Sequence, residues 1–513
     1  MSLRRRIGLA YLSGALPCFE DFGNLPTDLI RENGLVHGKP ASEVLDMLIL
    51  PSGSLLESQS INPAVSEEIL KMAKAGKFVL GIGSGLQVLA KRTNVKCLSA
   101  GSIIREGLGI IDADFQPLIC TDHIKAHIVD TSFLSDTIGT ELSGFHCHTY
   151  GKAIIHSDAK AVLVSHIEHT NYRKIPQDLF SGIANKEGNV VGVFVHTILD
   201  QNPAIINGIT KSLGIDQLEL QEIRKANTKL VAEIKNEIGI NTNIHPANVR
   251  IKKTPMMVLV TALGSGSGKT FLVTGMAGAL RKRGYNVGLI KLGGDVRDSI
   301  PALYLVKEPM KRYCSIKISE SGWTPIHESI DQACMAHDFL FVEGAMSAFT
   351  GLLNSRIRHP ASTLEVAASL NAPVIVVVTC DKEGIEGGLV NVLNYINVLK
   401  MLGVNPAGVI LNKMSTSYLT EDDKLVIHQA FKNVGVELIG VVPSLKFERR
   451  EMIPEVEICY DTFGTQAMNV VERYINLEQL VGLAKTPEQI NIDYTVFVEK
   501  FKKLLTTYSY KFL

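Results

Sequence analysis

The chain has 513 residues, enough for two or three domains, and its 46% hydrophobic and 20% charged residues are typical of a soluble globular protein. Its longest strongly apolar run, residues 372–380, has the length of a strand and is far shorter than the roughly 20 residues of a membrane-spanning helix. Lysine plus arginine and aspartate plus glutamate number 52 each, so no overall charge attracts nucleic acid. We therefore expect a cytoplasmic protein without membrane or nucleic-acid partners.

The eight cysteines are scattered and form no CxxC pair of the kind found in zinc sites and redox dithiols. We expect them to be reduced and mostly buried, as in a reducing cytosol. Three arginines at positions 4–6 precede an apolar stretch, as in a secretory signal, but that stretch is short and interrupted. We interpret it as the first strand of a folded domain.

The first 200 residues alternate between strand and helix patterns. Strands are predicted at 7–12, 47–51, 78–82 and 190–195, and helices at 63–75 and 85–91. Such alternation indicates a parallel sheet with helices on both faces, whose functional groups lie at the carboxyl ends of the strands.

Three segments follow such strand ends. Residues 81–89 have the strand, sharp turn and helix of a nucleophile elbow, residues 144–151 are rich in polar aromatics, and a strand ends on His196. His146 and His148 face the same side of an extended segment, so a metal site with His196 is an alternative hypothesis. Cys147 is the one thiolate at a suitable spacing, and no carboxylate is.

These segments, preceded by residues 16–22 and 50–54, resemble in order the class I glutamine amidotransferase domain of the cobyric acid synthase and cobyrinic acid a,c-diamide synthase family. The resemblance covers most of residues 7–200. It implies a cysteine thiolate that attacks the amide of glutamine, with a histidine as base. For His148 and His196 it also implies a role other than metal binding.

The elbow departs from the family pattern Gly-Ile-Cys-Gly-Gly-Tyr-Gln, because Gly83 occupies the nucleophile position. Ser84 comes one residue later and points elsewhere on so tight a turn. It can act with His196 only in a shifted GxSxG register, whose outer positions do not match. We therefore predict a degenerate amidotransferase site, formed by Gly83, Ser84, His148 and His196, without glutaminase activity.

The character of the chain changes after residue 202. Residues 218–238 are predicted to form a charged amphipathic helix, and residues 241–253 are polar and contain Pro246, as in a linker. We expect an amidotransferase-like domain at 1–205 and a helical and polar linker at 206–253.

A nucleotide-binding pattern begins at the apolar run 256–263, which leads into a glycine-rich turn and then a helix at 271–280. This is the order strand, phosphate loop, helix, in which backbone amides and the helix N-terminus bind phosphate oxygens. Leu263 stands where the first glycine of the usual pattern is expected, and a Gly/Ser linker does not fit between a buried strand and a helix. The predicted nucleotide-binding residues are Gly264, Ser265, Gly266, Ser267, Gly268, Lys269 and Thr270.

Charged residues follow the next strands of this region. Lys291 ends a strand and precedes Asp295 and Asp298, while Glu343 ends another, where a magnesium-binding or water-orienting carboxylate belongs. A solvated loop is the alternative for residues 292–299. Asn412 ends a further strand and is placed to read a purine base. Additional strands are predicted at 372–378 and 439–443.

Residues 256–450 resemble, with all motifs in order, the dethiobiotin synthetase-type ATPase domain of the same synthases. Gly264 stands where the related partitioning and arsenite-pump ATPases carry a signature lysine, which argues against dimer-activated hydrolysis. The resemblance implies ATP and Mg²⁺, and activation of a carboxylate as an acyl phosphate that ammonia captures. The implied catalytic residues are Lys269, Lys291, Glu343 and Asp295, and the implied metal ligands are Thr270, Glu343 and Asp295.

Other parts of this half of the chain are less defined. Arg356, Arg358 and His359 can hold substrate carboxylates, with a plain basic surface loop as the alternative. In the family the ATPase half comes first, whereas here it follows, as an expected domain at 254–450. Residues 451–513 are expected to form a helical C-terminal extension.

The predicted fold class is therefore α/β, with two doubly wound parallel-sheet domains and a helical tail. The first functional hypothesis is an ATP-dependent amide synthase for a polycarboxylic substrate such as a corrinoid or tetrapyrrole acid, using free ammonia or ammonia from a separate partner. The second is a regulatory or assembly ATPase whose amidotransferase-like half binds a ligand or partner. Dethiobiotin synthetase-like carboxylation is a third hypothesis. The sequence leaves the oligomeric state open, and a homodimer is one option.

Overall fold

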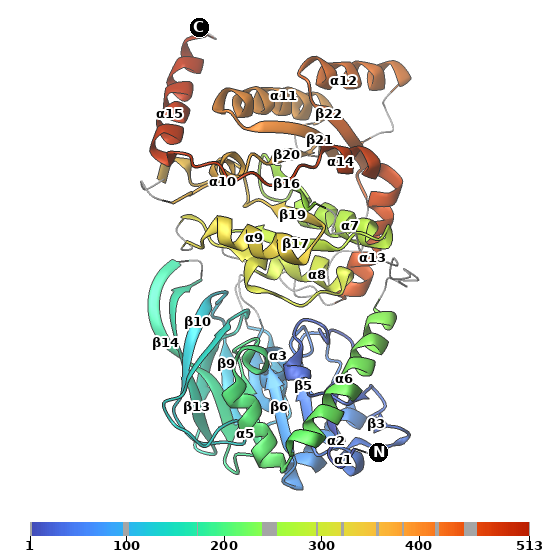
Figure 1. The fold of residues 1–513 in the computed structure, drawn as a ribbon, viewed down its shortest axis with the longest axis vertical. Coiled ribbons are helices and arrows are strands. Elements are labelled where there is room, and N and C mark those ends of the chain that lie inside the picture. Colours follow the sequence, from blue (N-terminus) through green and yellow to red (C-terminus); the bar gives the residue numbers. More distant parts are fainter. Residues whose placement is uncertain are drawn as a thin grey trace. The chain divides into compact units, whose positions relative to one another are not determined.

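A computed structural model describes residues 3–95, 102–171, 173–238, 254–293, 296–319, 323–354, 359–381, 384–415, 420–445 and 459–511. These residues divide into two compact units (Figure 1). The N-terminal unit is built mainly from the chain up to Ile238, and the C-terminal unit mainly from the segments after it. The expected linker residues 241–253 lie outside the described part of the chain.

The N-terminal unit contains a nine-stranded sheet in the order β11-β10-β13-β14-β15-β6-β5-β1-β2. One half is parallel, and its strands are β1 (Ile7–Ala10), β2 (Asp28–Ile30), β5 (Met47–Leu50), β6 (Phe78–Ile82) and β15 (Val190–Val193). β1, β5 and β15 are buried at every position, which is why they read as continuous apolar runs. The predicted parallel sheet is thus present.

The other half of this sheet is antiparallel, which the sequence pattern did not indicate. Its strands are β10 (His123–Ile128), β11 (Glu141–Phe145), β13 (Ala159–Thr170) and β14 (Arg173–Asn185), and β10, β13 and β14 lie side by side in Figure 1. β10 alternates between buried and more exposed residues, so one face of it is solvated. Because polar residues occupy that face, this strand lacks the continuous apolar run by which the parallel strands were predicted.

Helices of the N-terminal unit include α1 (Ala41–Val44), α2 (Pro63–Lys74), α3 (Ser84–Leu89), α4 (Ile198–Gln201), α5 (Pro203–Leu213) and α6 (Gln217–Glu237). The predicted C-terminal end of the helix at 85–91 is wrong, because α3 stops at Leu89 and a strand follows. That strand, β7 (Ala90–Asn94), belongs to a four-stranded sheet with β8 (Ile104–Glu106), β9 (Ile111–Gln116) and β12 (Lys152–Ile155). The hairpin β3 (Leu35–Val36) and β4 (Lys39–Pro40) and the short 3-10 helix η1 (Phe22–Asn24) complete this part.

The C-terminal unit contains a seven-stranded parallel sheet in the order β18-β17-β19-β16-β20-β21-β22. Its strands are β16 (Met256–Ala262), β17 (Val287–Leu292), β18 (Ser315–Ile316), β19 (Phe339–Glu343), β20 (Pro373–Thr379), β21 (Asn405–Met414) and β22 (Glu437–Pro443). Helices between them are α7 (Lys269–Lys282), α8 (Ile300–Val306), α9 (Ile326–Ala336), α10 (Thr363–Ser369), α11 (Gly384–Leu402) and α12 (Glu421–Asn433). The predicted α/β class is confirmed for this unit.

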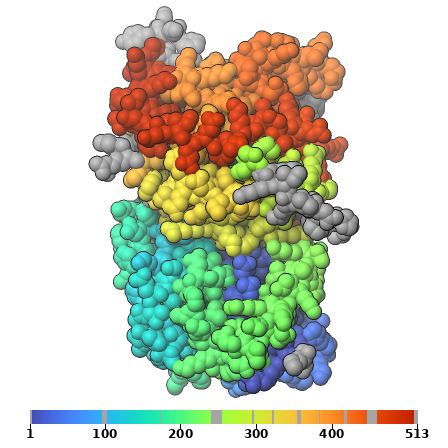
Figure 2. Space-filling model, viewed as in Figure 1, coloured from blue at the N-terminus to red at the C-terminus, as the bar shows by residue number. Residues whose placement is uncertain are grey.

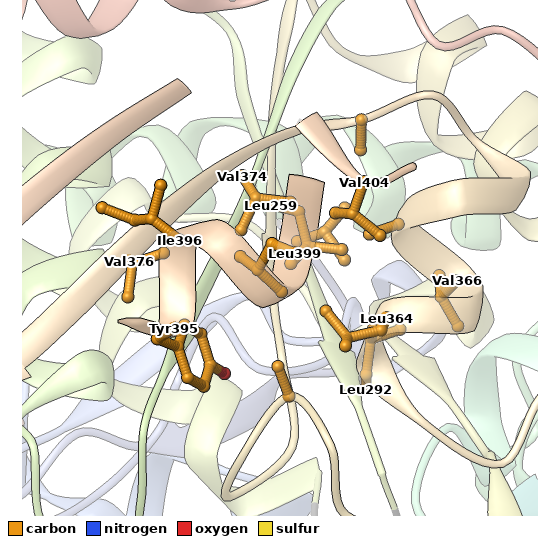
Figure 3. Packing of buried hydrophobic residues seen from close by; sticks show 14 of the residues in the cluster. Leu259, Leu292, Leu364, Val366, Val374, Val376, Tyr395, Ile396, Leu399 and Val404 are labelled. Carbon is orange, nitrogen blue, oxygen red and sulfur yellow. The ribbon is translucent and has the colours of Figure 1, made fainter. Parts of the chain in front are cut away.

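The core of the C-terminal unit forms where the sheet packs against its helices. Leu259 of β16 and Val374 of β20 are neighbours across the sheet, and Ile396 and Leu399 of α11 lie near them in Figure 3. All four side chains are completely buried. Burial of one such side chain contributes roughly 1.5–3 kcal/mol, so this cluster stabilises the packing of the helix on the sheet.

From Asp461 onward, the C-terminal extension is part of the second unit. It contains α13 (Tyr460–Tyr474), α14 (Leu477–Leu483) and α15 (Tyr494–Lys511), and Figure 2 shows these residues as a red band across that unit. Met257 and Lys485 exchange two backbone hydrogen bonds, of 2.8 and 3.2 Å. The Phe501 ring stacks on Phe349 with ring centres 5.5 Å apart. The described part of the extension is therefore helical, as predicted, and it contacts β21, β22 and α11 of this unit. None of the helices among the described residues is long and apolar enough to cross a membrane.

Candidate functional site

The glycine-rich turn between β16 and α7 has the backbone conformation of a phosphate loop. Gly266 and Gly268 have φ angles of 73° and 86°, in the region that favours glycine. A Cβ atom added to Gly264 or Gly266 meets nothing within 4 Å, so the space beside the backbone is open. α7 begins at Lys269 and directs its N-terminus, with its partial positive charge, to this space. The turn can therefore surround a phosphate group.

Two neighbouring strands place opposite charges beside the loop. Lys291 and Glu343 are paired in register at the carboxyl ends of β17 and β19, and Lys291 Nζ lies 2.8 Å from Glu343 Oε1. Thr270 Oγ1 donates to the same carboxylate oxygen at 2.8 Å, and Asp298 forms a second ion pair with Lys291 at 2.8 Å. Burial disfavours the charge of Lys291, but the carboxylates of Glu343 and Asp298 outweigh it and raise its pKa above the usual value.

This group of side chains fits a nucleotide with Mg²⁺. Hydroxyl and carboxylate oxygens are the ligands that Mg²⁺ uses in such sites, and Thr270 and Glu343 offer them side by side. The Ser267 hydroxyl is buried and has no hydrogen-bond partner among the described residues, so it can bond a phosphate oxygen. An unsatisfied buried hydroxyl is costly, and a bound anion would remove that cost.

Lys269 belongs to the same candidate site but has a different hydrogen-bond partner. Its Nζ donates to the Met346 carbonyl at 2.8 Å. Burial lowers the pKa of Lys269 to about 8, with Lys291 adding to the effect and the carboxylates of Glu343 and Asp298 opposing it. A phosphate beside this amine would favour its charged form. Lys269 is thus positioned to pair with a phosphate, and without one its pKa is about 8.

Asn412 and Lys413 contact the phosphate loop directly. Asn412 Nδ2 donates to the Ser267 carbonyl at 2.8 Å, and Lys413 Nζ donates to the Gly266 carbonyl at 2.8 Å. Both side chains support the backbone of the loop. The role of Asn412 in reading a base remains a prediction. Lys413 was not singled out from the sequence, although it directly follows Asn412.

Most of the remaining predicted residues of this unit cannot be placed in the site from the described part of the chain. Asp295, Arg356 and Arg358 lie outside the described residues. The His359 ring stacks on the exposed Trp323, with ring centres 4.1 Å apart. A groove of about 840 Å³ along β22 includes none of the phosphate-loop residues in its lining. The loop and its charged neighbours therefore define the candidate site.

The elbow of the N-terminal unit keeps its geometry without its nucleophile. Gly83, between β6 and α3, has φ 58° and ψ −115°, a conformation that L side chains rarely adopt. A Cβ atom added there would lie 3.4 Å from His196 Nε2 and 3.1 Å from the Ser52 Cβ. A side chain at position 83 would therefore point at the histidine, as a nucleophile must.

The histidine is held as a catalytic base is held. His196 Nδ1 lies 2.7 Å from Glu20 Oε1, and the Thr197 amide donates to Glu20 Oε2 at 2.7 Å. The side chains of His196 and Glu20 are 1% and 0% exposed. His196 Nε2 is buried and has no partner in the described chain, so its free nitrogen faces the elbow. Glu20 was missed as a site residue, although it lies within the 16–22 segment that carried the resemblance.

Ser84 does not replace the missing nucleophile in this structure. Its hydroxyl is buried at the start of α3, and neither it nor His196 Nε2 has a hydrogen-bond partner among the described residues. No Ser84–His196 bond therefore exists. His148, the fourth predicted residue, bonds to His146 with 2.6 Å between Nε2 and Nδ1. Burial lowers the pKa of His146 well below its usual value, with smaller contributions from His148 and His196.

Comparison with known families matches both halves of the chain. Residues 15–204 match the CobB/CobQ-like glutamine amidotransferase domain, and residues 258–450 match the CobQ/CobB/MinD/ParA nucleotide binding domain. The two matched regions follow one another along the chain. The CobB/CobQ-like domain comes first, which confirms the predicted resemblance and the predicted order of the two parts.

Curated relatives match part of the chain. The hydrogenobyrinate a,c-diamide synthase of Mycobacterium tuberculosis (strain ATCC 25618 / H37Rv) is 30% identical over 236 residues, 44% of this chain and 50% of the relative. The cobyrinate a,c-diamide synthase of Methanobrevibacter smithii is 28% identical over 238 residues, 45% of this chain and 50% of the relative. The cobyric acid synthase of Thermoanaerobacter sp. (strain X514) is 32% identical over 164 residues, 30% and 31% of the two chains. The chain thus spans about half the length of the first two relatives.

Proposed function

We propose that this protein is an ATP-dependent amide synthase that acts on a carboxylate of a polycarboxylic acid of the corrinoid type. The observation that carries the proposal is the joined group of Thr270, Glu343 and Lys291 beside an open phosphate loop. The names of the relatives, which are diamide synthases and a cobyric acid synthase, support the substrate class.

In this proposal the loop amides and Lys269 would hold the phosphates of ATP, and Thr270 and Glu343, with Asp295, would hold Mg²⁺. The metal would neutralise phosphate charge during transfer. A substrate carboxylate oxygen attacks the γ-phosphorus and ADP leaves, which gives an acyl phosphate. Lys291, kept protonated by its carboxylate neighbours, stabilises the negative charge on the transferred group. Ammonia then attacks the acyl carbon, and phosphate leaves.

The ammonia in this proposal comes from solution or from a separate protein, because position 83 offers no nucleophile to release it from glutamine. The test supplies ATP, Mg²⁺ and either cobyrinic or hydrogenobyrinic acid, with ammonium or glutamine as the nitrogen source. We expect ADP and the mass of an amide with ammonium and neither with glutamine. If neither acid binds, stimulates ADP release or yields an amide with ammonium, the proposal fails.

A second candidate follows from Gly83 itself. Loss of the nucleophile, with the His196–Glu20 pair intact, favours a nucleotide-dependent module whose first unit binds a ligand or partner without reaction. In that case ADP release responds to a ligand of the first unit and no amide forms.

We also propose that the functional domains extend over 1–205 and 254–450, with residues 206–253 connecting them.

A further inference from the structure

A buried cluster in the N-terminal unit combines one thiol and two imidazoles. The potential ligand atoms of Cys120, His146 and His148 all lie within 4.8 Å of one another, and all three residues are buried. The metal site considered from the sequence grouped the histidines with His196. The structure instead supplies a thiol from a segment 26 residues before His146, as positions 120 and 146 show.

Regular backbone pairing explains why the three side chains meet. Cys120 and His148 exchange two backbone hydrogen bonds of 3.0 Å, so they are directly opposite each other in an antiparallel arrangement. The His146 amide bonds to the Asp122 carbonyl at 2.7 Å, which continues the same pairing two residues further along. Residues at i and i+2 of an extended segment share a face, and so do directly opposed residues.

The histidines are oriented as metal ligands are. His146 Nδ1 faces His148 Nε2 at 2.6 Å, and the other His146 nitrogen is 3.0 Å from Ser165 Oγ. A ligand histidine normally uses its second nitrogen for such an outer hydrogen bond, which fixes the ring. Tetrahedral Zn²⁺, with Zn–N bonds of about 2.0–2.1 Å, separates two ligand nitrogens by about 3.3 Å. The pair therefore needs to open by less than an ångström.

We propose that Cys120, His146 and His148 bind one Zn²⁺ ion, with water in the fourth position. Thiolate and imidazole ligands without a carboxylate favour Zn²⁺ over Mg²⁺ or Ca²⁺. Binding exchanges the N–H···N bond for two N–Zn bonds and one S–Zn bond, and the thiol proton goes to solvent. The ion would fix the segment that carries Phe145, whose ring stacks on His196 with centres 5.1 Å apart.

The test begins with the full-length wild-type protein, stripped of metal and titrated with Zn²⁺ or Co²⁺. We expect one equivalent to bind, a rise in the unfolding temperature with Zn²⁺, and a thiolate-to-cobalt charge-transfer absorption with Co²⁺. Failure of the wild-type protein to bind one equivalent of metal, or binding without that absorption, overturns the proposal. Because these readouts use the wild-type protein, the result does not depend on the folding of a variant.

Variants then assign the ligands. Cys120→Ser should remove the charge-transfer absorption, and His146→Gln should reduce Zn²⁺ affinity and alter the cobalt spectrum. Ser165→Ala, which removes an outer hydrogen bond, should weaken Zn²⁺ binding by about 10–100-fold. Cys147→Ser is the matched control, because Cys147 lies between the two histidines on the alternate face and should bind no metal. An absorption that survives Cys120→Ser, or disappears in Cys147→Ser, overturns the assignment.

Discussion

Replacement of Gly83 by cysteine should give the N-terminal unit a glutaminase activity. The cysteine Cβ would lie 3.2 Å from His196 Cε1 and 3.4 Å from His196 Nε2, which has no hydrogen-bond partner in the described part of the chain. Glu20 already holds the other ring nitrogen at 2.7 Å, so the base is oriented before the nucleophile is added. We expect Gly83→Cys to release ammonia from glutamine and to form a thioester on the new thiol.

The cost of this change can be estimated from the same geometry. Gly83 has φ 58°, and a side chain in such a conformation costs on the order of 1–3 kcal/mol. The Ser52 Cβ, 3.1 Å from the new atom, must also move by a few tenths of an ångström. For a domain of this size about 1 kcal/mol lowers the unfolding temperature by roughly 2–4 °C. Gly83→Ala carries the same strain without the thiol and is the matched control.

The assay couples ammonia release to glutamate dehydrogenase. Adding His196→Ala to Gly83→Cys should reduce the rate by about 10²–10⁴-fold, the usual contribution of a general base. The reasoning is refuted if folded Gly83→Cys releases no more ammonia than Gly83→Ala. It is also refuted if His196→Ala leaves the rate of Gly83→Cys unchanged.

Three further predictions concern the C-terminal unit. Glu343→Gln should destabilise the protein by several kcal/mol, less the share that Asp298 retains, because it leaves the buried Lys291 without its buried partner. Denaturant unfolding measures this change, and Glu386→Gln in α11 is the control. The pKa of Lys269 is lowered to about 8, so phosphate contact with its charged form should be lost as pH rises above that value. Nucleotide affinity should therefore fall between pH 7 and 9.5 in the wild type and change much less in Lys269→Met; equal pH profiles would contradict this. Asn412→Ala removes the 2.8 Å hydrogen bond to the Ser267 carbonyl and leaves that carbonyl without this donor. The free energy of nucleotide binding should therefore weaken by about 1–3 kcal/mol. Asn433→Ala, at the end of α12, is the control and should not change it.

Local patterns in the sequence were sufficient for much of the C-terminal unit. Strand β16, the glycine-rich turn and α7 are consecutive, so a short stretch contains all that is needed to recognise a phosphate loop. Lys291 and Glu343 come from different strands, but parallel strands end at one edge of a sheet, and their proximity follows from the fold class. The predicted roles of these residues in catalysis and metal binding remain to be tested.

Tertiary structure decided the features that depend on distant pairing. Glu20 meets His196 across 176 positions, and no local spacing relates them. Cys120 joins His146 and His148 only through the register of an antiparallel pair, and a shift of one residue would turn its thiol to the other face. The sequence alone thus determined that the nucleophile is absent at Gly83 and that a phosphate loop is present. Only the folded chain shows that His196 and Glu20 are paired, because their contact depends on how segments far apart in the sequence pack together.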